Sequence, residues 1–169
     1  SKASFLVNYR YSLVAVVQKV GLNVGTGSAT PYYQDLNFKV NIPTTKAGTF
    51  SLFGLGGESH IKFDAIDEDN LYSTNDGSLR ERNFKSLTGV AGLTHTYFFD
   101  PATSGKIMLA VSGFDSKYRE DFYNSTKPDK TAFYKKNTQV KYSTGYTFNK
   151  KINSQNQLTA GVVADFNKL

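Results

Sequence analysis

The side chains that most often carry chemistry are few in this chain and lie far apart. The 169 residues include no cysteine and only two histidines, His60 and His95. A disulfide framework and a thiolate metal site are therefore excluded, and two histidines make a metal cluster only if carboxylates join them. No serine lies in a G-x-S-x-G sequence, which is the usual setting of a serine nucleophile. We expect no enzymatic activity, no metal and no cofactor, and each histidine is expected to line a wall or an interface.

Two glycine-rich stretches and one acidic stretch are the remaining candidates for ligand chemistry. "GTGSAT" (25–30) and "GLGGES" (54–59) do not follow a strand and open a helix, as phosphate-binding loops do. The acidic "DAIDEDN" (64–70) lacks glycine at the sixth position counted from Asp67, so it does not fit a calcium loop. We predict a solvated external loop there, with an irregular cation site at Asp67 and Asp69 as the alternative.

Charge and hydropathy limit the possible partners. The formal net charge is +6, but the basic residues are scattered along the chain, so we expect no nucleic-acid partner. No run of 18 apolar residues occurs, which excludes a membrane-spanning helix. A membrane-spanning β-strand needs only about 9–11 residues of alternating character. The high aromatic content of 14% favours that possibility.

Alternation with a period of two recurs along the chain and predicts seven strands. It is clearest in "LNFKVNI" (36–42), "TQVKYSTGYTF" (138–148) and "QLTAGVVADF" (157–166). One face of these strands is predicted to meet lipid and carries Phe38, Val40, Tyr142, Tyr146, Leu158 and Val162. The other face is predicted to line a lumen and carries Asn8, Arg10, Asn37, Lys39, Lys141 and Asp165.

Short and long connections between the predicted strands alternate. The short ones span 43–48, 100–105 and 149–156, and the long ones span 12–33, 64–83 and 116–135. An up-and-down sheet places alternate connections at the same end, so tight turns are expected at one end and large loops at the other. This asymmetry is typical of outer-membrane barrels. A short helix is predicted inside the first long connection, from Ser12 to Gly21.

The strand at 49–63 has three glycines near its middle, Gly54, Gly56 and Gly57, where its apolar face changes. Glycine weakens a strand interior and often marks a bulge, a bend or a close approach. We predict a bulge or kink that curves the wall. The alternative is that a plug inside the lumen approaches the backbone there.

"FLVNYRYS" followed by "YQDLNFKVNIPTTKAGTFSLFGLGGES" resembles the barrel of TonB-dependent outer-membrane receptors of the Bacteroidetes type, over about residues 4–63. The resemblance implies an all-β, antiparallel up-and-down transmembrane β-barrel of about 22 strands, of which residues 1–169 are an interior section without plug domain or TonB box. It implies uptake of a large or scarce nutrient across the outer membrane of a Gram-negative bacterium, with ligand-binding residues that the sequence does not identify.

The resemblance also implies the partners. They are outer-membrane lipid, the plug and remaining strands of the receptor, and the TonB system indirectly. Because seven strands leave two unpaired edges, we predict that residues 4–11 and 156–166 pair with more of the receptor, a second chain or an assembly protein. Two alternatives are a soluble lipocalin-like barrel, which usually has a tryptophan that this chain lacks, and a small structural or adhesive barrel, which needs an even strand count.

Overall fold

The computed structural model describes residues 2–12, 29–63, 79–124 and 127–168. They form seven strands: β1 (Ser4–Tyr11), β2 (Ala29–Pro43), β3 (Thr49–Phe63), β4 (Leu79–Asp100), β5 (Thr103–Asn124), β6 (Lys127–Lys151) and β7 (Gln157–Lys168). The helix predicted at 12–21 and the acidic stretch 64–70 lie outside the described residues, apart from Ser12.

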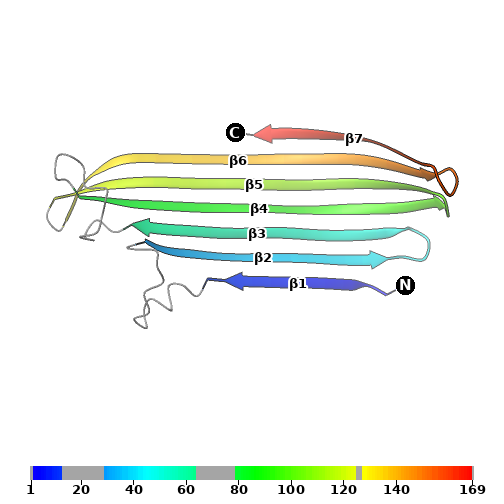
Figure 1. Ribbon diagram of the computed structural model, residues 1–169, viewed down its shortest axis with the longest axis horizontal. Coiled ribbons are helices and arrows are strands. Elements are labelled where there is room, and N and C mark those ends of the chain that lie inside the picture. Colours follow the sequence, from blue (N-terminus) through cyan, green and yellow to red (C-terminus); the bar gives the residue numbers. More distant parts are fainter. Residues whose placement is uncertain (1, 13–28, 64–78, 125–126, 169) are drawn as a thin grey trace.

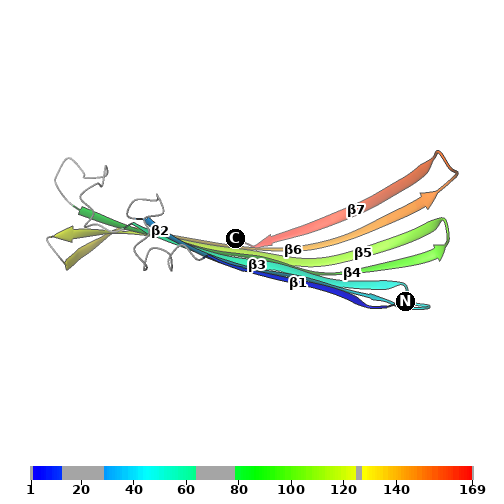
Figure 2. The same cartoon turned by 60° about the horizontal axis from the view of Figure 1, so that its bottom comes forward.

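The seven strands form one antiparallel sheet in chain order, β1 to β7. They run side by side along the long axis of the molecule (Figure 1), which confirms the predicted up-and-down order and strand number. The sheet twists strongly, and β6 and β7 diverge from β1 and β2 toward the turn end (Figure 2). Within the described residues β1 and β7 are the two edges of the sheet and do not pair with each other. The described strands are therefore not closed into a barrel, and both the closed barrel and the pairing of its edges with further strands stay predictions.

The three predicted short connections are tight turns at one end of the sheet (Figure 1). In the first turn, the backbone N–H and the hydroxyl of Thr44 each donate to the carbonyl of Gly48 at 2.8 Å. Gly48 has a φ of 79°, and a side chain there would overlap the carbonyl of Thr96. This position requires glycine on both counts. The next turn is fixed by Asp100, whose Oδ1 accepts the N–H of Ala102 at 2.7 Å.

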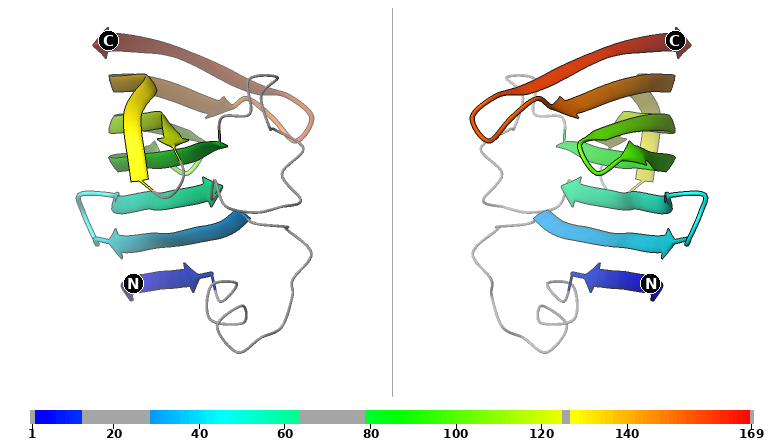
Figure 3. Two further views of the ribbon diagram at one scale, coloured as in Figure 1. Left: turned by 90° about the vertical axis from the view of Figure 1, so that its left-hand side faces the viewer. Right: turned by 90° about the vertical axis from the view of Figure 1, so that its right-hand side faces the viewer.

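The predicted long connections were too long, and one of them was wrong. β5 continues to Asn124 and β6 begins at Lys127, so most of 116–135 is strand. β4 begins at Leu79 and β2 at Ala29, inside the other two predicted connections. The sequence rule failed because these strand segments carry charged and polar residues on the face that is apolar nearer the turns. Their pairing is nevertheless continuous apart from two register shifts, at Glu120/Asp121 and Phe122/Tyr123. Beside these shifts the first part of β6 turns out of the line of the sheet (Figure 3).

The predicted bulge at the glycines of β3 is also wrong. All of β3 pairs with β2 and β4 without a register shift. The ring of Phe38 on β2 lies where a side chain at Gly54 would stand, and the ring of Phe53 likewise covers Gly92 on β4. Gly54 and Gly92 make room for an aromatic ring from the neighbouring strand, whereas Gly56 and Gly57 face the neighbouring strands β4 and β2 without a ring.

The described strands form a single layer (Figure 3). Of the residues described, the buried ones are Ser12, Gly54, Gly92, Gly105 and Glu120, and none of them carries a large apolar side chain. Phe5, Val162 and Phe166 are 81%, 67% and 67% exposed. Because a sheet is stable only when its apolar face is covered, something outside the described residues must cover this one.

Candidate functional site

The strand register divides the sheet into two faces. Directly opposed residues of antiparallel neighbours point to the same side of a sheet. We call the side with Val40 the Val40 face and the side with Asn37 the Asn37 face. Residues opposed across the strands form rows that run perpendicular to them.

The six predicted lumen residues all lie on the Asn37 face. One row joins Asn8 on β1, Asn37 on β2 and Lys141 on β6, through intermediate partners on β3, β4 and β5. The adjacent row nearer the turns contains Lys39 and Asp165, and Arg10 lies one row farther from the turns. These six residues therefore share one side of the sheet, and that this side lines a lumen stays a prediction.

Polar contacts on this face join neighbouring strands. Arg10 Nε donates to both carboxylate oxygens of Asp35 at 3.0 Å, and Lys141 Nζ lies 3.7 Å from Asp165 Oδ2. Ser143 donates to Asp165 Oδ1 at 2.6 Å. These pairs tie β1 to β2 and β6 to β7, but their exposed cations make them weak contributors to stability.

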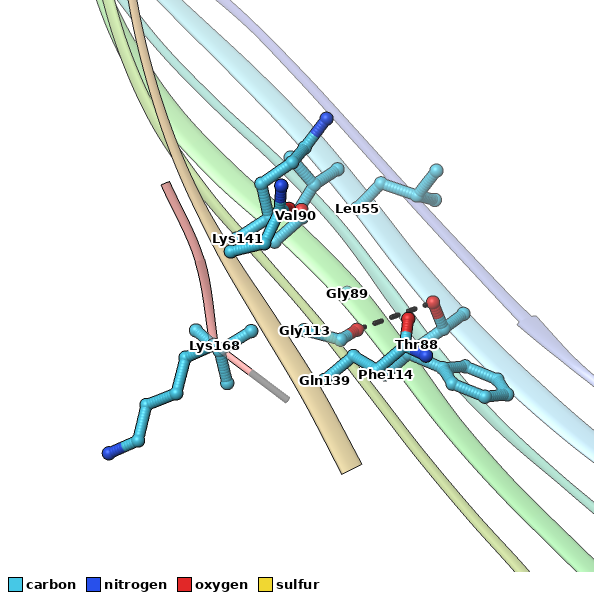
Figure 4. Close-up of a pocket in the computed structure, with 12 residues that line it drawn as sticks. Leu55, Thr88, Gly89, Val90, Gly113, Phe114, Gln139, Lys141 and Lys168 are labelled. Carbon is cyan, nitrogen blue, oxygen red and sulfur yellow. Dashed lines mark hydrogen bonds between the residues drawn. The ribbon is translucent and has the colours of Figure 1, made fainter. Parts of the chain in front are cut away.

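A shallow hollow of about 340 Å³ lies on the Asn37 face across β3 to β7. Figure 4 shows it, with Lys141 and Gln139 from β6 on one side and Leu55 from β3 on the other. The Thr88 hydroxyl donates to the Gly113 carbonyl at 3.4 Å in its floor. Sequence reasoning missed this feature because its lining comes from several strands, among them Leu55 on β3 and Val90 on β4. The pairing of β3 with β4, which only the structure gives, brings these two residues together.

The Val40 face carries an apolar band of five successive rows near the turns, one row short of the row of Thr103, Lys150 and Leu158 that ends this face. On β4 the band runs from Gly89 to Tyr97, which is about 27 Å at 3.4 Å per residue. Its middle row is Phe5, Val40, Leu52, Leu93, Leu109, Thr144 and Ala164. Among the described residues, the only Asp, Glu, Lys or Arg in these rows is Lys168, at the end of β7. All six predicted lipid-facing residues lie on this face.

Aromatic rings gather where this band meets the turns. His95 stacks on Phe50 with ring centroids 4.3 Å apart, and Tyr97 contacts Phe99 edge-on at 5.3 Å. His95 Nε2 lies 2.6 Å from the carbonyl oxygen of Ala47 in the first turn, so this nitrogen carries the proton and donates. His95 thus has a structural role at the rim of the sheet, as predicted.

Farther from the turns the two faces exchange character. The Val40 face there carries charged side chains, with ion pairs of 3.1 Å from Lys62 to Glu81 and 2.8 Å from Arg119 to Asp121. The Asn37 face carries aromatic rings at the same level, where Tyr118 and Phe133 lie 5.9 Å apart. The exchange falls between the rows of Gly89 and Lys85 on β4.

Among these rings lies a partly buried ion pair. Glu120 is 9% exposed, and its Oε1 lies 3.6 Å from Arg82 Nε on the facing strand. The Tyr118 hydroxyl donates to Glu120 Oε2 at 3.2 Å. Burying a carboxylate is costly unless it is paired and hydrogen-bonded, and these contacts meet that need. The pair cross-links β4 and β5 in the half of the sheet that sequence reasoning treated as a loop.

Within the ranges that the structure describes, no three His, Cys, Asp or Glu side chains come together as a metal site. No helix in those ranges is long and apolar enough to cross a membrane. Comparison of the chain with protein-family models, with curated proteins and with solved structures gave no match. The functional argument therefore depends on the two faces.

Proposed function

We propose that this sheet is part of the wall of an outer-membrane β-barrel. The observation that carries the proposal is the apolar band of the Val40 face, about 27 Å long on β4 and therefore about 21 Å high along the membrane normal at a strand tilt near 40°. Outer-membrane barrels present an outward apolar band about 25 Å tall with aromatic residues at its rims. The band continues across all seven strands, and lipid would cover the apolar side chains that nothing in the described residues covers.

The Asn37 face would then line the lumen. Its band-level rows carry Asn8, Asn37, Lys141 and Asp165, which suit contact with water or with a plug inside the barrel. The edges β1 and β7 would pair with further strands, because an unpaired strand edge in lipid leaves backbone groups unsatisfied. Those strands would belong to the same receptor, a second chain or an assembly protein.

We further propose that the barrel acts in TonB-dependent uptake of a large or scarce nutrient. Support for this step comes from the resemblance of residues 4–63 to such receptors and from the two unpaired edges of the sheet, which leave room for the further strands of a larger barrel. A soluble lipocalin-like barrel is less favoured, because its apolar face should stay on one side along the whole strand. Here the apolar side changes partway along β4, β5 and β6.

Single-cysteine labelling tests the wall, since the chain has no native cysteine. Spin labels at Val40→Cys and Asn41→Cys in the membrane-embedded protein should differ in their accessibility to oxygen and to a nickel chelate. The first should collide with dissolved oxygen and be shielded from a water-soluble nickel chelate, and the second should show the reverse. A label at Lys117→Cys, on the Val40 face but beyond the band, should meet the nickel chelate. Equal nickel accessibility at Val40 and Lys117 would contradict a lipid-facing band.

A growth comparison tests the uptake step separately. Loss of this protein and loss of the energy-coupling protein TonB should cause the same defect on the same scarce nutrient source, and the double loss should add nothing. If the labelling test succeeds but the two losses share no growth defect, the proposed barrel stands and TonB-dependent uptake is rejected.

A further inference from the structure

A row of basic side chains crosses four strands on the Val40 face, just beyond the apolar band. His60 on β3 opposes Lys85 on β4, Lys85 opposes Lys117 on β5, and Lys117 opposes Lys136 on β6. We call these four residues the lysine row. Neighbouring strands are about 4.8 Å apart, so the row places four basic groups within about 15 Å. Like charges directly opposite each other destabilise a sheet. A bound anion would therefore relieve the repulsion within this row.

The described residues supply only part of the negative charge that would balance the lysine row. Asp115 lies 3.8 Å from Lys117 Nζ and 3.7 Å from Lys136 Nζ, and its Oδ2 also accepts the Thr138 hydroxyl at 2.7 Å. Glu58 borders the row and accepts Gln34 Nε2 at 2.5 Å. In the described ranges Lys85 has no carboxylate within 4.0 Å.

The row also borders a hollow with an unused donor. A cavity of about 290 Å³ is lined by His60, Lys85, Lys117, Glu58 and Asp115 among others. His60 Nε2 is buried and has no hydrogen-bond partner there. Lys117 and Lys136 keep about half of their side chains exposed, 48% and 50%. The hollow therefore offers two ammonium groups and an imidazole nitrogen to a group that arrives from outside.

The level of the row on the sheet indicates what that group is. Lys85 is four residues beyond Gly89, the last band residue on β4, which is about 14 Å along the strand and about 10 Å along the membrane normal at a tilt near 40°. Polar headgroup layers extend about 5–8 Å beyond the hydrocarbon on each side. Long lysine side chains can extend back toward that layer.

We propose that the lysine row binds the phosphate groups of an anionic lipid in the membrane leaflet at this end of the barrel, an inference that rests on the proposed barrel wall. Lys85 and Lys117 bind the phosphate as ammonium donors, His60 Nε2 donates a hydrogen bond to it, and Lys136 holds the second negative charge. Lipid phosphate replaces the missing counter-charge of the row. A free phosphate ion offers the same chemistry, and the test separates the two.

The test uses the protein extracted from its membrane and reconstituted in phosphatidylcholine nanodiscs. The discs contain a trace of diphosphoryl lipid A or of the same lipid without its phosphates, and the lipid retained by the purified protein is measured by mass spectrometry. The variant combines Lys85→Gln, Lys117→Gln and Lys136→Gln. A matched control combines Lys39→Gln, Lys135→Gln and Lys141→Gln, which removes the same charge from the Asn37 face.

The wild-type protein and the control should retain the diphosphoryl lipid in preference to the dephosphorylated one. The lysine-row variant should lose affinity by roughly 100-fold, about fivefold per lysine. Equal losses in variant and control, or equal retention of both lipids by the wild type, would overturn the proposal while leaving the barrel wall intact. Inorganic phosphate that binds the detergent-solubilised protein as tightly as the lipid would assign the row to free phosphate instead. Failure of the wild type to enter the bilayer would reject the wall itself.

Discussion

The turn-proximal and distal halves of the same strands use their two faces in opposite ways. In the turn-proximal half the Val40 face is apolar across five rows and the Asn37 face carries Asn8, Asn37 and Lys141. In the distal half the Val40 face carries Lys85, Lys117 and Lys136, and rings lie on the Asn37 face. The same strands therefore run through both halves of the sheet, while the character of the side chains on each face changes between them.

The difference teaches that backbone pairing and side-chain environment are separate determinants here. Pairing between β4 and β5 is unbroken from Leu79 to Phe98, so the hydrogen-bond ladder does not respond to the change of face. The exchange of character is expected for a wall that leaves a bilayer, because its outer side then meets water and its inner side meets other protein. A water-soluble barrel has no comparable boundary along its strands.

A charge in the middle of the apolar band should have the largest effect. Val40→Arg places a guanidinium in the central row, and a charge near the bilayer midplane of a barrel costs about 2–4 kcal/mol. We expect the variant to assemble poorly, measured as the heat-resistant folded fraction in isolated outer membranes. Two controls sharpen the comparison. Asn41→Arg, on the other face, and Tyr134→Arg, on the Val40 face but in the distal half, should both assemble nearly as well as the wild type.

The second effect separates the two halves by their ion pairs. Glu120→Ala removes the buried carboxylate beside Arg82 and the acceptor of the Tyr118 hydroxyl. Leaving buried polar groups without their partner costs about 1–3 kcal/mol, and this should appear as a lower denaturant midpoint of the detergent-folded protein. Asp165→Ala breaks an exposed pair with Lys141 in the other half and should cost less than about 1 kcal/mol. Equal losses would mean that the distal half is no better packed than the proximal half.

The third effect tests the contact between a glycine and a ring in the apolar band. A side chain at Gly54 overlaps the Phe38 ring, so Gly54→Ala should cost about 1–3 kcal/mol by overpacking. Phe38→Leu in the same chain should recover part of that cost, since the smaller side chain can move aside. The double-mutant cycle in denaturant unfolding measures the coupling. Purely additive losses would show that the ring does not need the glycine.

Sequence reasoning predicted the turn-proximal half well, because one environment acts on each face there. Alternation in 36–42 and 157–166 placed Val40 and Val162 on one face and Lys39 and Asp165 on the other, as the register does. The tight turns were recognisable from Gly48 and Asp100, whose residue types are needed for the backbone there. The two edge strands, β1 and β7, could be predicted because the count of seven strands was right.

The distal half was missed because the rule of alternation assumes a constant apolar side. Between Ser116 and Lys135 charged residues such as Lys117 and Arg119 occupy the face that was apolar before, so the segment resembled a loop. The lysine row was invisible for another reason. Its members come from four strands that lie far apart in the sequence, and only the register aligns them.

The smallest expected effect concerns the rim of the turn-proximal half, where Asp100 ends β4 beyond the apolar band. Hydrogen bonds from Thr103 and from the Ala102 N–H lower the pKa of the Asp100 carboxyl below its usual value. A folded-state pKa below the unfolded one gives stability that is present above the unfolded pKa and lost as the pH falls through the folded pKa. The unfolding temperature of the detergent-folded wild type should therefore fall with acidification through this range by more than that of Asp100→Asn. The asparagine keeps an acceptor but cannot ionise.

The two proteins should differ at neutral pH and converge in acid, where the wild-type carboxyl is protonated as well. Because Asp100 is exposed to solvent at the turn, the difference should be smaller than those at Val40, Glu120 and Gly54. A gap that persists unchanged into acid would show that the amide itself, rather than the lost charge, disturbs the turn. A gap that opens only in acid would reverse the sign of the linkage and place the stabilising contacts on the protonated carboxyl.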